Sequence, residues 1–220
     1  GFRDLKPFLF CNVLTNTLIR NHLQQHLPAA SLDYCVQLWE QNPFHFHLSK
    51  KRISKSGDFT CKHGHTPRIT INKDLHSFEF LITYIHEVAH LHVHQKHGFR
   101  AEAHGVEWKN KFKELLTPVL AEHVFPNDIL VCLQKHMANP KASTYSDTEL
   151  TKLLRSKDPR AAQTTLLSQL PEGSIFDLNG RWFKKGKLRR TRVLCLEVKS
   201  KRQFLVPADV PVGNAQLSFL

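Results

Sequence analysis

The chain has 220 residues, of which 41% are hydrophobic and 23% are charged, and its formal net charge is +12. This composition is ordinary for a globular protein and supplies enough apolar material for a core. No apolar run approaches the roughly 18–20 residues that span a bilayer, and the first residues lack the charged-then-apolar plan of a secretory signal. We therefore expect no membrane partner.

The positive charge is concentrated in the last third of the chain. Residues 151–220 hold 14 lysines and arginines against 5 acidic residues, a balance of +9, whereas residues 1–150 hold 17 against 14. A basic segment attached to a near-neutral body favours a polyanionic partner, with nucleic acid first. The alternative is a solvated basic surface that only aids solubility.

The five cysteines are scattered and form no C-x-x-C pair. A disulfide framework or a cysteine-based zinc site is not expected from an odd, dispersed set. A reducing compartment is favoured, and the cytoplasm is the expected location. Nothing in the sequence indicates the oligomeric state, and a monomer is favoured.

The first part of the chain predicts helices followed by a small sheet. Leucines and valines at helical spacing predict one helix over residues 5–27 and a second over 31–41. Alternation over 44–48 predicts a strand, and the segments 53–60 and 68–71 predict two more, joined by a turn. Together these strands predict a small antiparallel sheet.

Helices dominate the next stretch. Apolar periodicity predicts a long helix over 77–95, another from Gly105 to about Pro118, and a shorter one that Asn127 can cap. Ser146 and Glu149 form a capping-box pattern for one more helix, ending near residue 155.

The pattern changes to short strands after residue 168. Ile175 to Leu178 leads into Asn179-Gly180, a strong hairpin signal, and further strands are predicted at 182–183, 191–198 and 203–206. With the boundary near 157–168, the sequence predicts an α+β chain. A compact domain of helices on a small antiparallel sheet (1–157) precedes a small basic β-rich domain (168–220).

The most informative motif is His86-Glu87-Val88-Ala89-His90, which reads H-E-x-x-H. Residues four apart lie on the same side of a helix, so His86 and His90 can bind one metal ion together, with Glu87 beside the water it carries. The motif lies within an apolar helix, where polar groups without partners would be costly. A zinc ion would give both imidazoles a partner.

A catalytic zinc needs a third protein ligand, since it usually has three and keeps one position open. His104 is the leading candidate, because it follows a glycine-containing loop and precedes the next helix. His92, His97, Glu102 and Glu107 remain alternatives, whereas His94 points along the same helix as the pair. With one zinc bound, Glu87 would take a proton from the metal's water during attack on a peptide carbonyl and pass it to the leaving nitrogen.

These residues resemble the SprT-like zinc metalloprotease family, in which H-E-x-x-H is followed by a loop and a third His, then Gly and an aromatic residue. Here the matching segments are 86–90 and His104-Gly105-Val106-Glu107-Trp108. The strand at 68–72, the turn at 139–143 and the basic strand at 189–192 extend the resemblance, which covers about residues 7 to 206.

The resemblance implies a compact zincin fold, with His86, His90 and His104 as zinc ligands and Glu87 as the catalytic base. It also implies proteolysis near nucleic acid, because the family's eukaryotic relative Spartan degrades proteins crosslinked to DNA. Many members carry a C-terminal zinc ribbon, but this tail holds only Cys195. A second zinc site is therefore not expected.

Three functions compete at this stage. The first is a zinc protease acting on a protein substrate near nucleic acid, with DNA contacted through basic residues of the tail: Lys184, Lys185, Arg189, Arg190 and Arg192. The second is a metal-dependent nuclease, disfavoured because the position six residues after His90 is Lys96. The third is a nucleic-acid-binding adaptor whose zinc only stabilises the fold. For the neighbouring Trp182 and Phe183, burial in the β-domain core is the expectation.

Overall fold

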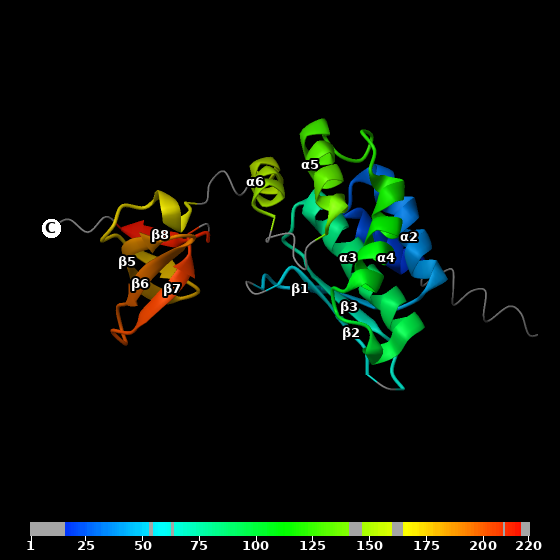
Figure 1. Cartoon of the computed structure of the whole chain (residues 1–220), viewed down its shortest axis with the longest axis horizontal. Helices are drawn as coiled ribbons and strands as arrows, with labels where there is room; N and C mark the ends of the chain where they lie inside the picture. The colour runs from blue at the N-terminus through cyan, green and yellow to red at the C-terminus, as the bar shows by residue number, and fades with distance from the viewer. Residues whose placement is uncertain are drawn as a thin grey trace, which may run out of the picture. The chain divides into compact units, whose positions relative to one another are not determined.

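The computed structural model describes residues 16–52, 55–62, 64–140, 147–159, 165–208 and 210–216. The chain divides into two compact units, Gly1–Lys157 and Asp158–Leu220, each described below by itself. Helices and small sheets together make it an α+β protein, as the sequence predicted (Figure 1). None of the described helices is both long and apolar enough to cross a membrane.

The first unit contains a three-stranded sheet made of β1 (His45–Ser49), β2 (Gly57–Thr60) and β3 (Arg68–Asn72). Its order is β1-β3-β2. β2 and β3 form the expected antiparallel hairpin, but β1 runs parallel to β3, so the prediction of an antiparallel sheet was wrong for this pair. Apolar alternation identifies strands without fixing the direction of pairs that no short turn connects. The strongly buried β3 takes the central place.

Helices cover this sheet, and their bounds agree closely with the periodicity. Residues 16–24 are helical, while residues 1–15, where the first predicted helix begins, lie outside the described residues. The others are α2 (Leu32–Gln41), α3 (Ser77–His97), α4 (Val106–Leu116), α5 (Asn127–Ala138) and α6 (Thr148–Lys157). No side-chain cap bond from Asn127 forms at α5, which begins after Pro126. Ser146 of the predicted capping box also lies outside the described residues.

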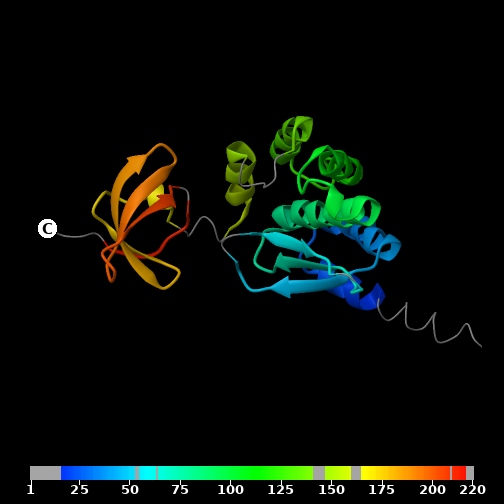
Figure 2. The ribbon, with the colours of Figure 1, turned by 60° about the horizontal axis from the view of Figure 1, so that its bottom comes forward.

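The long helix α3 lies at the centre of the unit, between the sheet and α4 (Figure 2). Residues from Phe80 to Val93 are buried on several sides of the helix, and Leu81, Ile85 and Val88 are almost fully enclosed. Tyrosine hydroxyl groups tie α3 and α4 to α2, because Tyr84 donates to the carbonyl of Cys35 at 2.9 Å and Tyr34 to that of Leu115 at 2.8 Å. The polar residues of the H-E-x-x-H motif are therefore set in a rigid, packed helix.

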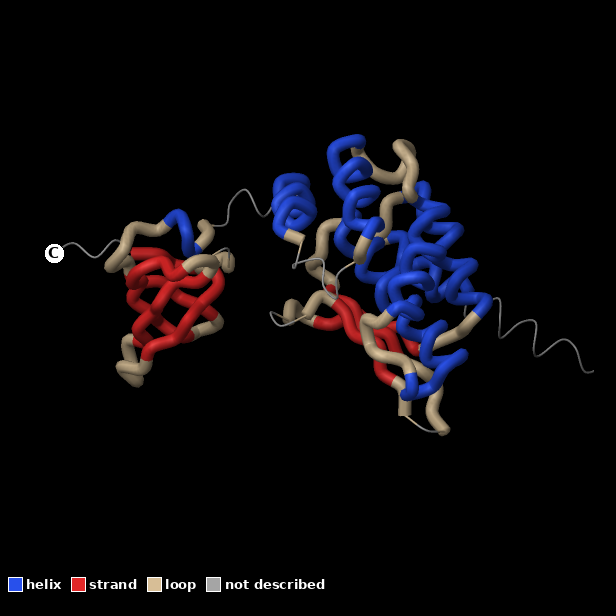
Figure 3. The backbone as a smooth tube through the Cα atoms, viewed as in Figure 1, coloured by secondary structure: helices blue, strands red, loops and turns tan. Residues whose placement is uncertain are grey.

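The second unit is a five-stranded antiparallel sheet with a short 3-10 helix, Leu167–Gln169 (Figure 3). Its strands are β4 (Ile175–Leu178), β5 (Arg181–Arg189), β6 (Arg192–Glu197), β7 (Gln203–Pro207) and β8 (Gly213–Gln216), in the order β7-β6-β5-β4-β8. Asn179 and Gly180 have φ angles of 61° and 75° and close the β4–β5 hairpin, which confirms that prediction.

The core of this unit is small and aromatic. Phe176, Phe183, Val193 and Cys195 are buried together, and the rings of Phe176 and Phe183 stack. Trp182 was expected to join them but is 39% exposed, because successive side chains of β5 point to opposite faces and Phe183 takes the inner one.

Candidate metal centre

The helix α3 brings His86 and His90 together. It begins after His76, whose ring accepts a hydrogen bond from the backbone of Phe78, and it continues past the motif to His97. The two imidazoles therefore lie one helical turn apart, with their Nε2 atoms 3.2 Å from each other.

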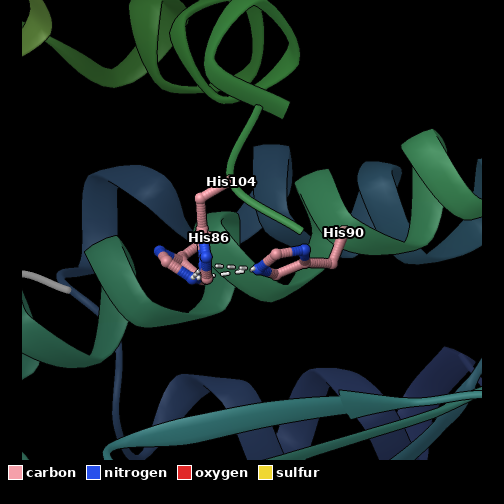
Figure 4. A group of neighbouring side chains, drawn as sticks. All are labelled: His86, His90 and His104. Atoms are coloured by element: carbon pink, nitrogen blue, oxygen red, sulfur yellow. Dashed lines mark hydrogen bonds between the residues drawn. The ribbon is translucent and has the colours of Figure 1, made fainter. Parts of the chain in front are cut away.

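His104 completes a cluster of three histidines. The chain leaves α3 at Gly98, whose φ of 61° favours glycine, and passes through the 3-10 turn Gly98–Arg100 before α4 begins. This reversal returns His104 to α3, where its Nε2 lies 3.1 Å from that of His90 and 3.3 Å from that of His86 (Figure 4). Among the described residues these three form the one group of at least three potential ligands, and they could hold a metal ion.

The alternative third ligands lie elsewhere. His92 contacts the side-chain amide of Asn42 at 3.3 Å. The ring of His94 packs against Phe59 and Phe99. In the part of the chain that the structure describes, neither they nor His97, Glu102 and Glu107 join the cluster.

The spacing of the three nitrogens suits a metal better than hydrogen bonds among the rings. A neutral imidazole has one N–H donor and one acceptor nitrogen, so three Nε2 atoms that all face one another cannot each be satisfied. Two nitrogens bound to a tetrahedral zinc ion at about 2.0–2.1 Å are roughly 3.3 Å apart. The observed separations of 3.1–3.3 Å are close to this value.

Trp108 packs against all three histidines from the first turns of α4. Its ring centroid lies 4.5 Å from that of His86, 5.4 Å from that of His90 and 4.8 Å from that of His104. The indole is fully buried, donates to the His86 carbonyl at 3.4 Å and stacks on Phe112. In the sequence, Trp108 was identified only as the aromatic residue that follows His104 and Gly105, and no contact between it and the histidines was predicted. Its position one turn after His104 was the signal for a contact with the site.

Burial keeps the three imidazoles in the neutral form that binds metal. It lowers the pKa of His86 well below its usual value, with further lowering by His90, His104 and His136. Burial and the nearby His104 lower the pKa of His90 to about 4. The pKa of His104 is also lowered by burial, against an opposing effect of Glu102.

Glu87 is a buried carboxyl, with 5% of its surface exposed. Burial, and to a smaller extent the nearby Asp58, raise its pKa to about 8 against the opposing effects of a hydrogen bond from the backbone of Phe59 and of Arg52 and Lys55. The carboxyl thus lies between α3 and β2, directly after the first histidine of the cluster.

The basic residues of the second unit differ in their exposure. Arg189 and Arg192 are paired across the β5–β6 hairpin and are exposed, as is Arg190 at its turn. Lys184 is exposed further along β5. Lys185 is 9% exposed, and its ammonium donates to the carbonyls of Ser168 and Leu170. Its charge is therefore engaged inside the fold.

Comparisons of the chain with protein-family models, with curated proteins and with solved structures find no match.

Proposed function

We propose that the first unit is a zinc-dependent metalloprotease of the SprT-like, zincin type, which hydrolyses peptide bonds. The observation that carries the proposal is the convergence of the Nε2 atoms of His86, His90 and His104 at 3.1–3.3 Å, with Glu87 adjacent in the same helix. Three nitrogen ligands leave a fourth tetrahedral position open, which is typical of catalytic rather than structural zinc.

The donor set fits one zinc ion per chain. Neutral imidazoles suit Zn²⁺, and the described residues place no thiolate in the cluster. A zinc ion bound there would supply Lewis acidity, polarising a carbonyl oxygen and lowering the pKa of a bound water to about 7.

Glu87 is the proposed general base. Its carboxyl accepts a proton from the attacking water and returns it to the leaving nitrogen, a role that works best when the pKa of the group lies near the operating pH. Without a metal, burial holds the pKa of Glu87 near 8, and a bound cation would favour the charged carboxylate that can accept the proton. Trp108 keeps the three imidazoles in fixed orientations through its ring contacts.

The second unit is proposed to direct the protease to nucleic-acid-associated proteins. Three exposed arginines at one hairpin tip, Arg189, Arg190 and Arg192, offer charged donors for phosphate oxygens, and Lys184 adds a further exposed charge. Binding of DNA by the whole chain should weaken steeply as salt rises. An affinity that is independent of salt, or unchanged when the three arginines are replaced by glutamine, would remove this part of the proposal.

The test of the catalytic role is cleavage of a DNA-bound basic protein by the zinc-loaded chain. Glu87→Gln keeps the shape of the side chain but removes the base, and should lower the rate by about 10²–10⁴-fold at equal zinc content. Glu107→Gln is the matched control, because Glu107 is exposed on α4, outside the cluster, and its replacement should leave the rate unchanged. Equal cleavage by wild type and Glu87→Gln would refute the proposal and favour the adaptor with a structural zinc.

A further inference from the structure

Gly57, at the start of β2, lies directly against the side chain of Glu87. A Cβ atom built on Gly57 would be 2.8 Å from Glu87 Oε1, 3.0 Å from Glu87 Cγ and 2.7 Å from Thr83 Cγ2. The φ angle of Gly57 is not in the left-handed region, so the backbone conformation itself does not require glycine. The close approach of α3 requires glycine at this position, because no larger side chain fits without moving Glu87 or Thr83.

The strand β2 turns a backbone donor toward the same carboxyl. In an antiparallel pair, alternate residues direct their N–H and C=O groups to the partner strand. The backbone N–H of Asn72 in β3 donates to the carbonyl of Ser56 at 2.8 Å, so Ser56 directs its backbone groups toward β3. Gly57 and Phe59 therefore direct their backbone groups to the opposite side, which is the free edge of the sheet. The N–H of Phe59 is hydrogen-bonded to the carboxyl group of Glu87.

A polar network fixes this edge of the sheet. Asn72 is 2% exposed, and its Nδ2 donates to the carbonyls of Arg52 and Lys55 at 3.0 Å each. Arg52 in turn donates to Asn72 Oδ1 at 2.7 Å and to Asp58, the residue between Gly57 and Phe59. Arg52 and Lys55 are therefore tied to Asn72 of β3, and Arg52 extends this network to Asp58 within β2.

We propose that Gly57 and the backbone N–H of Phe59 are positioning groups that fix the Glu87 carboxylate, Gly57 by the absence of a side chain and Phe59 by its hydrogen bond. The catalytic consequence of this inference rests on the proposed function, but the positioning itself does not. A carboxylate held at two points loses little freedom when it acts on a substrate, whereas a displacement of about 1 Å can cost about 10²-fold in rate.

The first test needs neither zinc nor activity. Amide hydrogen exchange of Phe59 is measured by NMR in the metal-free full-length chain. Glu87→Ala should accelerate that exchange about 10-fold or more, whereas Glu87→Gln retains an acceptor oxygen and should change it little. Gly57→Ala should also accelerate it, because the added methyl displaces the carboxyl. Equal protection of Phe59 in wild type and Glu87→Ala would overturn the inference, whatever the activity of the protein.

The second test separates positioning from general stability. Gly57→Ala should lower kcat about 10–100-fold, with KM changed less than about twofold and zinc content unchanged. Gly213→Ala is the matched control, since the nearest atom to its added Cβ is Asp177 Oδ1 at an ordinary 3.8 Å. It should keep the wild-type kcat.

The double variant Gly57→Ala/Thr83→Ser removes the Thr83 methyl that the new side chain would meet. The thermal stability lost in Gly57→Ala should recover in the double variant. Its kcat should stay low, because the contact of the new Cβ atom with Glu87 remains. Recovery of kcat together with stability would show a purely structural role for Gly57 and would overturn the inference. If the wild-type protein cleaves no substrate, the proposed function fails, and the exchange measurement still decides the positioning.

Discussion

Zinc binding by the wild-type protein should weaken as pH falls from 7.5 to 6.0, because of Glu87 rather than the histidines. Burial raises the pKa of Glu87 to about 8, so its carboxyl is protonated over this range in the metal-free protein. A divalent cation beside the carboxyl favours the charged form. Zinc binding therefore releases a proton. The affinity for zinc should increase with pH up to about 8 and decrease as the pH is lowered from there.

The size of the effect follows from the two protonation states. If the pKa of Glu87 is about 8 without zinc and below about 5 with it, lowering the pH from 7.5 to 6.0 weakens binding by about 25-fold. Burial lowers the pKa of all three histidines, that of His90 to about 4, so they add less than ordinary imidazoles would. Three ordinary imidazoles, with a pKa near 6.5, would instead weaken binding by roughly fourfold each over the same range.

Competition with a chelator of known zinc affinity at each pH measures this dependence. Glu87→Gln is the control, because it removes the titrating carboxyl and leaves the three imidazoles in place. Its zinc affinity should change less than about threefold over the same range. The same pH dependence in the variant and the wild type, or none in the wild type, would refute the reasoning.

Three further predictions concern packing, a turn and thiol chemistry. Trp108→Ala should lower the free energy of unfolding by about 3–5 kcal/mol, because it leaves a cavity, and it should also weaken zinc binding. Trp108→Phe should have a smaller effect on both, and chemical denaturation and zinc titration measure the two effects. Gly180→Ala should destabilise the second unit by about 1–2 kcal/mol, because alanine is strained at the φ of 75° there, and thermal unfolding of the full chain checks this. Alkylation followed by mass spectrometry should label the partly exposed Cys61 in the native protein well before Cys35, whose thiol pKa is raised by complete burial.

The sequence predicts the centre of the site because its geometry is local. His86 and His90 are related by one turn of a helix whose apolar periodicity is clear, and the glycine-containing loop before His104 is short enough to return the chain to that helix. The hairpin at Asn179-Gly180 is predictable for the same reason, since two residues specify the turn.

The features that sequence reasoning missed depend on contacts between distant segments. The parallel direction of β1 relative to β3 follows from how the chain passes between strands that no hairpin turn connects. The contact between Gly57 and Glu87 joins residues 30 positions apart, and no periodicity signals it. Lys185 looks like its basic neighbours in the sequence, and only its inward position on β5 shows that two carbonyls already hold its charge.

Metal analysis of the purified chain, wild type beside His104→Ala, tests the central claim most directly. The proposed zinc centre predicts one zinc per wild-type chain and its loss in the variant, because two imidazoles from one helix hold zinc far less tightly than three that converge. No zinc in the wild type after loading, or equal zinc in both proteins, would contradict the three-histidine centre on which the proposed activity depends.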